Sequence, residues 1–393
     1  MFRILVIDVG STSLKIGLFT DEKPLFKETV DYRKRFVANL TGTLGLDMRV
    51  ASKVSEEQRC STSEGARIPG EEGQREEEFS HFLQWIGQIL QRHGEAESRF
   101  DLIVSRGGLT RPLRSGAYLI DEAMCRELRV GRYGWHPSNL GPLLAYEIGS
   151  RGRVPAIVFD SPVSDEMEAV ARISGLKGIE RRAAFHVLSQ KAAGRKAARA
   201  LGNDYEDINL IIAHLGGGIT VCAHRKGRII DGNHGLSEGP FTPQRAGGLP
   251  VEAVVELCFS GRFETKERLK ACLFNRGGVI SYLGTHDIPE IEARIRSGDQ
   301  EAELVLRAMC YQIGKEMGAM AAVLKGRVDG IVLTGNMVYS SFLVKEIEPF
   351  ITFLAPVYVF PGDDELENLA SGGLEVLKGG NFSSVRRYGV NVD

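Results

Sequence analysis

The sequence predicts an α/β protein that contains two copies of one strand-rich unit. Two stretches carry this prediction. ILVIDVGSTSLKIGLF, residues 4–19, places a glycine and three hydroxyl residues between two apolar runs. NLIIAHLGGGITVCAHRKGRIIDGN, residues 209–233, repeats that order in the second half of the chain, with three glycines at the turn. Short apolar runs bounded by glycine are typical of strands, and a repeated order of features indicates a duplicated unit.

Each copy is expected to begin with three strands. In the first copy, the strands are 4–7, 14–19 and PLFKETV, with a turn at TDEK before the third. In the second copy, they are 210–213, 219–223 and RIID, with a turn at HRKG. Glycine in the first turn of each copy permits unusual backbone angles and lets a ligand approach the backbone closely.

Further strand-and-turn segments follow in the same order in both halves. DLIVSRGG, residues 101–108, is similar to DGIVLTGN, residues 329–336. VPAIVFDSPVSDEM, residues 154–167, is similar to APVYVFPGDDEL, residues 355–366. We therefore expect a duplicated α/β domain with a cleft between the copies. Two glycine loops facing each other across a cleft can hold a polyphosphate through backbone N–H groups, although a single hairpin of this kind is common.

Helices are expected between these strands. The spacing of apolar residues predicts helices at 79–94, 138–152 and 164–175, the last with Ser164 as N-cap, and a long buried helix at 301–326. Segment 45–79 has few large apolar residues and dense mixed charge. It is expected to be an exposed excursion, with a lid or a partner site as the alternative interpretation.

Composition excludes several classes of protein. A chain of 393 residues is long enough for two domains, and a net charge of −2 gives no support for binding to nucleic acid or to a membrane surface. The six cysteines form no C-x-x-C pair, which favours a reduced, cytoplasmic protein. No apolar run reaches the ~18 residues of a membrane span. Asp8 and Lys15 interrupt the first apolar stretch, which is unlike a signal peptide.

Many blocks in one order resemble the acetate and butyrate kinase family of the actin, hexokinase and sugar-kinase superfamily. They include SRGGL, HPSNLG, DEMEAVARISG, FHVLSQKA, AHLGGGI, EGPFTPQRAGGLP and GGVISYLGT, and they are most similar to the butyrate kinases. The resemblance covers nearly the whole chain apart from 45–79. It implies duplicated actin- and ribonuclease-H-like domains: 1–185 on the acyl-substrate side and 186–365 on the nucleotide side. Residues 366–393 are then a C-terminal helix and tail, with the helix packing back on the first domain.

The resemblance also implies an activity. Such enzymes transfer the γ-phosphate of ATP, reversibly and in line, to a short-chain carboxylate, here butanoate first of all, and they require Mg²⁺. A cytoplasmic homodimer or larger homo-oligomer is expected as well. Because the carboxylate nucleophile is already ionised, no general base is needed. The protein must supply alignment and charge stabilisation, which calls for arginine, histidine and backbone N–H groups.

The resemblance assigns roles to individual residues. The expected catalytic residues are Arg106, His186, Arg245 and Asp160. His136 and Asn139, together with Arg106, are expected to bind the acyl substrate. The expected nucleotide and phosphate contacts are Gly10, Ser11, Thr12, Ser13, Lys15, His214, Gly216, Gly217, Gly218, Asp287, Gly335 and Asn336. Asp8 and Glu365 are expected near the magnesium ion, largely through water, with Asp364 as the adjacent alternative.

Three departures from the family pattern leave alternatives open. Asp8 stands where relatives carry asparagine, Asn336 replaces the last glycine of TGG, and segment 231–241 is one residue shorter. One methylene changes discrimination by only ~1–3 kcal/mol, so acetate, propionate or a branched acid are alternative substrates. A nucleotide-binding regulatory or assembly protein without turnover is the second alternative, although the retained arginines and His186 favour an enzyme.

Overall fold

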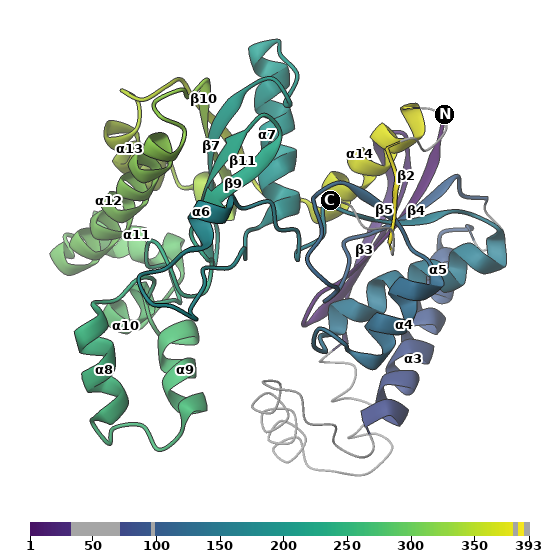
Figure 1. The fold of residues 1–393 in the computed structure, drawn as a ribbon, viewed down its shortest axis with the longest axis horizontal. Helices are drawn as coiled ribbons and strands as arrows, with labels where there is room; N and C mark the ends of the chain where they lie inside the picture. Colours follow the sequence, from purple (N-terminus) through teal and green to yellow (C-terminus); the bar gives the residue numbers. More distant parts are fainter. Residues whose placement is uncertain (33–70, 96–98, 380–383, 389–393) are drawn as a thin grey trace. The chain divides into compact units, whose positions relative to one another are not determined.

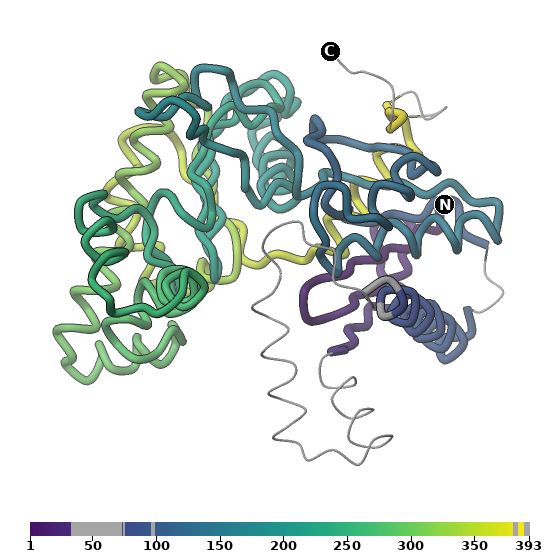
Figure 2. The backbone as a smooth tube through the Cα atoms, turned by 60° about the horizontal axis from the view of Figure 1, so that its bottom comes forward, coloured from purple at the N-terminus to yellow at the C-terminus, as the bar shows by residue number. Residues whose placement is uncertain are grey.

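The computed structural model describes residues 1–32, 71–95, 99–379 and 384–388. The chain divides into two compact units: unit 1 comprises Met1–Val163 and Asp364–Asp393, and unit 2 comprises Ser164–Asp363. The sequence placed these divisions after residues 185 and 365, whereas the structure groups 164–185 with unit 2. Residues 364–379, yellow in Figures 1 and 2, belong to the same unit as residues 1–32.

Unit 1 is built on a seven-stranded sheet in the order β12-β5-β6-β4-β1-β2-β3. Strand β1 (Arg3–Val9), inside this sheet, pairs antiparallel with β2 and parallel with β4. The other strands are β2 (Ser13–Thr20), β3 (Lys23–Asp31), β4 (Leu102–Ser105), β5 (Ala117–Leu119), β6 (Ala156–Phe159) and β12 (Arg386–Arg387). The strands predicted at 4–7 and 14–19 therefore form, and both are longer than predicted.

Helices cover both faces of this sheet. They are α3 (Glu71–Arg92), α4 (Glu122–Val130), η2 (Pro137–Asn139), α5 (Leu140–Gly152) and α14 (Glu365–Lys378). Alternate residues of β1 point to opposite faces. Leu5 and Ile7 join the core that contains α5, whereas Ile4 lies against Gly373 of α14. Residues 45–70 of the excursion predicted at 45–79 lie outside the described residues. Its remaining residues, 71–79, form the beginning of α3.

Unit 2 repeats the same arrangement with five strands in the order β11-β10-β7-β8-β9. They are β7 (Asn209–Leu215), β8 (Ile219–Arg225), β9 (Arg228–Gly232), β10 (Gly330–Gly335) and β11 (Val357–Pro361). As with β1, the central strand β7 pairs antiparallel with the next strand and parallel with the later one. This order matches β6-β4-β1-β2-β3 of unit 1, so the predicted duplication of an α/β fold is confirmed.

Helices again lie on both faces of the second sheet. Ile211 and Ala213 of β7 pack in one core with α12 (Gln300–Val323), whereas Leu210 and Ile212 pack in another with α7 (Val187–Leu201). The remaining helices are α6 (Ala169–Arg172), α8 (Val251–Phe259), α9 (Lys266–Asn275), α10 (Val279–Leu283), α11 (Ile288–Arg296), η3 (Asn336–Tyr339), α13 (Ser341–Ile347) and η4 (Glu348–Phe350). None of the helices in the described ranges is long and apolar enough to cross a membrane.

The helix predicted at 164–175 is mostly absent, because only the single turn α6 forms there. Long-range and local polar contacts replace the helix. Both carboxylate oxygens of Asp165 bind Arg172 at 2.6 Å. The carboxylate of Glu166 accepts the N–H of Ile229 and pairs with Lys191, which ties this segment to β9 and α7.

Candidate active site

In unit 1, charged side chains gather where β1 and β4 end and α14 begins. Arg106 directly follows β4, and its Nε lies 3.0 Å from Oδ1 of Asp8 in β1. Its Nη1 lies 3.0 Å from Oε1 of Glu365, the first residue of α14. Lys15, opposite Asp8 in the β1–β2 pairing, forms an ion pair with the same Glu365. Two carboxylates and two cations thus form one cluster from four separate segments.

The first glycine turn lies beside this cluster. The N–H of Gly10 donates to the carbonyl of Ser13 at 2.8 Å, and the Gly10 carbonyl accepts the hydroxyl of Tyr32 at 2.7 Å. A Cβ on Gly10 would lie 3.9 Å from Nη2 of Arg106. Ser11 and Thr12 are exposed at the tip. The turn is therefore held at its base and open at its tip, next to a guanidinium group.

The two carboxyl groups of the cluster have opposite pKa shifts. Burial raises the pKa of Asp8. The positive charge of Arg106 opposes this rise and the negative charge of Glu365 adds to it, so the pKa of Asp8 is about 6. Burial also acts to raise the pKa of Glu365, but Arg106 and Lys15 outweigh it and the pKa is lowered. Near neutral pH, Asp8 is therefore the group of the pair that takes up a proton first.

Replacing Asp8 with asparagine is expected to change how stability depends on pH. The pKa of Asp8 rises from an ordinary 3.8 to about 6 on folding, so the folded state favours the protonated form. The contribution of Asp8 to the stability of the folded state is fully present below pH 3.8 and is lost as pH rises to about 6. The free energy of unfolding of the wild type, relative to Asp8→Asn, should fall over this interval by on the order of 2–3 kcal/mol. Denaturant unfolding at several pH values measures this.

The exposed Asp204→Asn is the matched control for that titration. Measured alongside, it shows what the loss of one exposed carboxylate does between pH 4 and pH 6, the interval in which Asp8 titrates. A difference for Asp8→Asn that rises with pH over this interval would contradict the assignment.

Glu365, and not Asp364, is the acid that reaches the cluster. Oδ1 of Asp364 accepts the N–H of Glu367 at 3.1 Å and so caps α14, while Oδ2 binds Lys27 at 2.7 Å. Both oxygens of Asp364 are thus engaged outside the cluster, whereas Glu365 lies in it.

Two other residues expected in the site are buried in its scaffold. Asp160 is completely buried with φ of 43°, and its Oδ1 accepts the N–H of Gly116 at 2.8 Å. Asn139 is also completely buried; its Oδ1 accepts the N–H of Leu109 at 2.8 Å, and its Nδ2 donates to two carbonyl groups. Their burial opposes direct contact with substrate, because their polar atoms hold the loops after β4 and β6.

His136 lies closer to the cluster. Its Nδ1 accepts the N–H of Ser138 at 3.1 Å, which caps η2. Burial lowers the pKa of His136, and the positive charge of Arg106 lowers it further. The ring is therefore neutral near pH 7 and lies within the electrostatic reach of Arg106.

In unit 2, a second cluster surrounds the Gly216–Gly218 turn between β7 and β8. The N–H of Gly216 donates to the Gly218 carbonyl at 3.1 Å, and the Thr242 hydroxyl donates to the Gly217 carbonyl at 2.8 Å. A Cβ on Gly218 would collide with Nη1 of Arg245 and would lie 3.4 Å from Cε1 of His186. A glycine at 218 thus allows a guanidinium and an imidazole to converge on the turn.

Arg245 is a half-buried cation beside this turn. Its Nη1 donates to the carbonyl of Gly235. No ion pair is found for Arg245 within the described part of the chain. Burial lowers its pKa, but a guanidinium stays charged at all physiological pH values. A cation without a carboxylate partner, next to backbone N–H groups, is suited to binding an anion.

Two histidines stack beside Arg245. The rings of His186 and His214 lie 4.1 Å apart between centroids with an interplanar angle of 22°. His214 is 6% exposed, and burial lowers its pKa to about 4, so its ring is neutral. Its Nδ1 has no hydrogen-bond partner among the described residues. Sequence reasoning placed His214 beside the turn but contained no signal for the stacking.

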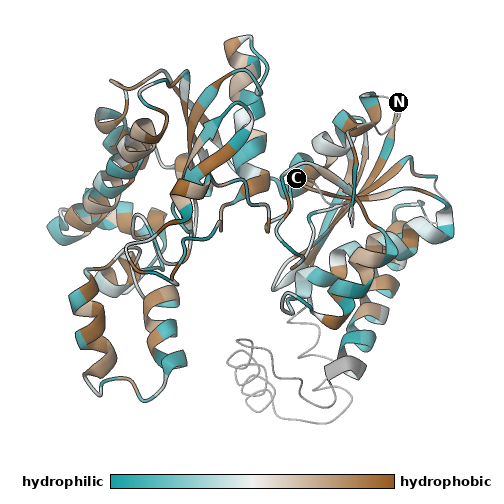
Figure 3. Cartoon of the chain, in the orientation of Figure 1, coloured by the Kyte–Doolittle hydropathy of each residue, from teal (hydrophilic) through white to brown (hydrophobic). Residues whose placement is uncertain are grey.

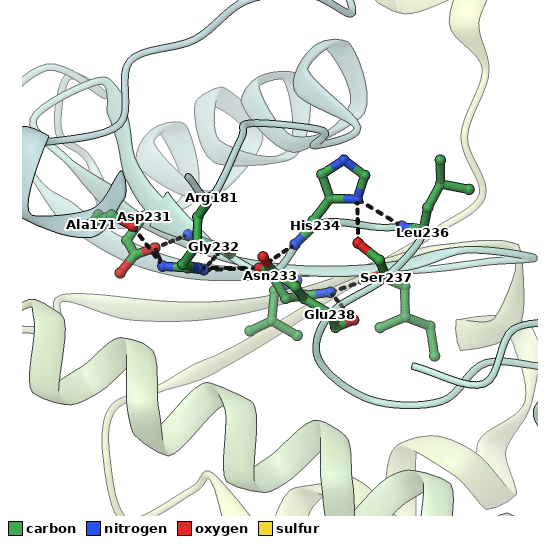
Figure 4. A network of polar contacts seen from close by, with 11 residues as sticks. Ala171, Arg181, Asp231, Gly232, Asn233, His234, Leu236, Ser237 and Glu238 are labelled. Carbon is green, nitrogen blue, oxygen red and sulfur yellow. Dashed lines mark hydrogen bonds and ion pairs between the residues drawn. The ribbon is translucent and has the colours of Figure 1, made fainter. Parts of the chain in front are cut away.

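Arg181, which sequence reasoning missed, fixes the loop that meets Arg245. It donates to the side chains of Asp231 and Glu238 and to the carbonyl of Gly232, as Figure 4 shows. Glu238 in turn accepts the N–H of His234 at 3.1 Å. This network holds residues 231–238, which are part of the shortened segment 231–241. The carbonyl of Gly235 in this segment accepts from Arg245. No local motif marks Arg181, because its partners are distant in sequence.

The end of β10 lies against the same glycine turn. Gly335 has φ of 95°, and a Cβ there would collide with the carbonyl oxygen of Leu215, so this position requires glycine. Asn336 follows, exposed, at the start of η3. Asp287 is different: its Oδ1 accepts the N–H of Glu290 at 3.0 Å and caps α11.

Comparisons with known proteins agree with this architecture. A model described as the acetokinase family matches residues 169–375. An acetate kinase from Porphyromonas gingivalis superposes with a TM-score of 0.72 at 19% identity, covering 96% of this chain and 100% of that one. A propionate kinase from Francisella tularensis superposes with a TM-score of 0.68 at 17% identity, covering 95% of this chain and 99% of that one. An acetate kinase from Entamoeba histolytica superposes with a TM-score of 0.66 at 17% identity, covering 94% of this chain and 98% of that one. These likenesses show the fold.

Proposed function

We propose that this chain, which belongs to the acetokinase family and is therefore an ATP-using carboxylate kinase, phosphorylates butanoate to butanoyl phosphate. The observation that carries the proposal is the convergence of Arg245 and His186 on the glycine turn at Gly218. Arginine, imidazole and backbone N–H groups that lie close together at one turn suit the transferred phosphoryl group. The choice of butanoate rests on sequence blocks such as HPSNLG and EGPFTPQRAGGLP.

In this proposal, a carboxylate oxygen of the substrate bonds to the γ-phosphorus of ATP. The bond from that phosphorus to the β,γ-bridging oxygen breaks, and ADP leaves. No proton is transferred, so the residues contribute charge and alignment. Arg245 and His186 contact the phosphoryl oxygens, the two glycine turns bind the nucleotide phosphates, and Arg106 and His136 bind the acyl substrate.

Magnesium is proposed to bind with the nucleotide near Asp8 and Glu365. The buried Oδ1 of Asp8 lacks a hydrogen bond of good geometry in the described structure, although Arg106 lies near it, and carboxylate oxygens suit this ion. No three His, Cys, Asp or Glu side chains form a metal cage in the described ranges. That fits an ion held mainly by phosphates and water, which would neutralise charge on the phosphates when bound.

A cytoplasmic location and a homodimer or larger homo-oligomer complete the proposal. Helix α8 supports self-association, because none of its residues is buried. Val251 and Phe259 are 79% and 86% exposed, and much of this helix is hydrophobic in Figure 3. A second copy of the chain is the proposed cover for this face.

The experiment is a specificity series in which the acyl phosphate is trapped as a hydroxamate. Purified folded protein, ATP and Mg²⁺ are combined with acetate, propionate, butanoate, isobutanoate or pentanoate. We expect kcat/KM to be highest for butanoate, by about 10-fold over propionate, because one methylene in an apolar pocket contributes ~1–3 kcal/mol. A maximum of kcat/KM at acetate or propionate would overturn the butanoate assignment. If none of the acids yielded a hydroxamate, the proposed kinase activity would be overturned.

One observation favours the alternative of a chain that binds ATP without turnover. Arg106, the proposed substrate contact, is held by Asp8 and by Glu365 at 3.0 Å each. These two carboxylates offset the positive charge of Arg106 and occupy its Nε and Nη1, which weakens its attraction for another anion. The same hydroxamate assay, with ATP binding measured in parallel, separates the two functions.

A further inference from the structure

A chain of five hydrogen-bonding side chains runs through the interior of unit 2 and ends at His186. Tyr205 Oη lies 2.6 Å from Nδ1 of His224, and Nε2 of His224 lies 3.0 Å from Oε1 of Gln190. Nε2 of Gln190 lies 2.9 Å from Oγ1 of Thr220, which lies 3.0 Å from Nδ1 of His186. His224, Gln190 and Thr220 are completely buried. Water therefore does not compete for these contacts.

The direction of every donor in this chain follows from one carbonyl group. The backbone oxygen of Thr220 can only accept, and Nε2 of Gln190 lies 3.0 Å from it, so the NH₂ end of the amide faces Thr220. The amide oxygen then faces His224, whose Nε2 must donate. Because burial and the charge of Lys191 lower the pKa of His224, its ring is neutral and Nδ1 accepts from Tyr205.

The same reasoning continues to the catalytic histidine. The amide of Gln190 also donates to Oγ1 of Thr220, and the described partners of that oxygen are Gln190 and His186 alone. The hydroxyl hydrogen of Thr220 is then directed at Nδ1 of His186. A neutral ring that accepts at Nδ1 carries its proton on Nε2.

We propose that Gln190 and Thr220 are positioning residues that hold His186 as a neutral imidazole with its proton on Nε2. Nε2–H of His186 then donates to the phosphoryl group beside Arg245 and Gly218. The opposite tautomer would instead direct a lone pair at the phosphoryl oxygens and repel them. His224 and Tyr205 hold the amide of Gln190 in its required orientation. This inference rests on the proposed role of His186, and its test reads the tautomer separately from turnover.

The decisive variant is Gln190→Glu, which reverses the polarity of the chain. A carboxyl group at this place removes the donation to Oγ1 of Thr220, so the threonine hydroxyl turns to donate to it. Thr220 then accepts from Nδ1–H of His186. We expect kcat to fall about 100-fold, with the KM for ATP changed less than about 3-fold. Gln300→Glu, at an exposed position, adds the same charge and should change neither property.

Thr220→Val and Thr220→Ser test the next link and cover the possibility that Gln190→Glu does not fold. Valine keeps the shape but removes the donor to Nδ1, so we expect mixed tautomers and a kcat lowered about 10-fold. Serine retains the hydroxyl and should restore kcat to within about 3-fold of the wild type.

The tautomer itself is read by ¹⁵N NMR of histidine-labelled protein, with His186 assigned by its loss in His186→Asn. We expect the proton on Nε2 in the wild type, on Nδ1 in Gln190→Glu and on both in Thr220→Val. A wild-type proton on Nδ1, or an unchanged tautomer in both folded variants, would overturn the inference. A shifted tautomer with unchanged kcat supports the network and instead overturns the proposed role of His186 in transfer.

Discussion

Replacing Arg245 with alanine is expected to lower kcat by about 10²–10³-fold while the protein stays folded, the loss typical for one preorganised charge-stabilising group. Arg245 is the cation at the Gly218 turn, and no ion pair neutralises it within the described residues. Negative charge on the phosphoryl group in flight would lose this fixed partner. KM for ATP should change much less than kcat. Steady-state kinetics measures this, and circular dichroism checks the fold.

Matched variants separate the charge from the geometry. Arg245→Lys keeps the charge but loses the planar fork, so a partial loss is expected. Arg268→Ala removes an exposed arginine on α9, 66% exposed, and should leave kcat unchanged. If Arg245→Ala retained wild-type kcat with a normal fold, Arg245 would have no part in phosphoryl transfer.

Gly218→Ala tests the same guanidinium group by displacing it without changing Arg245 itself. Its Cβ would collide with Nη1 of Arg245, the tip of a flexible side chain, so activity should suffer far more than stability. A Cβ on Gly217 meets no atom within 4 Å. Gly217→Ala therefore leaves Arg245 in place and should lose less activity than Gly218→Ala.

Replacing Arg106 with alanine is expected to lower kcat by about 10²-fold and also to destabilise unit 1. Arg106 lies between the carboxylates of Asp8 and Glu365, and its removal leaves the buried Asp8 without its cation. The cost is about 3 kcal/mol, at the low end for a broken buried pair, because Lys15 still neutralises Glu365. Kinetics and denaturant unfolding measure the two effects.

The double variant Asp8→Asn, Arg106→Ala separates chemistry from buried charge. An asparagine at position 8 needs no cation, so most of the lost stability should return while kcat stays low. Recovery of kcat together with stability would show that Arg106 acts only as a counter-ion for Asp8, and not on the substrate.

The strands and glycine turns could be predicted from the sequence because their signals are local. Apolar runs such as Leu210–Ala213 and the glycines after them specify hairpins by themselves. Segment 164–175 was wrongly predicted as a helix, because Glu166 is committed to Lys191 and to the backbone at Ile229, contacts that no local pattern reveals.

Part of the candidate site could be named from the sequence, but its arrangement could not. Arg106, His186 and Arg245 follow from family blocks, yet the sequence shows neither the pairing of Arg106 with Asp8 nor the stacking of His186 on His214. Both join segments far apart in the chain. The scaffold positions of Asp160 and Asn139 likewise depend on burial, which appears only after folding.

The most direct test of the central claim follows phosphorus itself. Folded protein is incubated with ATP, Mg²⁺ and butanoate, and ³¹P NMR records all phosphorus species. We predict a new acyl phosphate signal that grows in step with ADP and that disappears in Arg245→Ala. Bound ATP that persists with no acyl phosphate, from butanoate or from any two- to five-carbon acid, would contradict the claim that this chain is a carboxylate kinase.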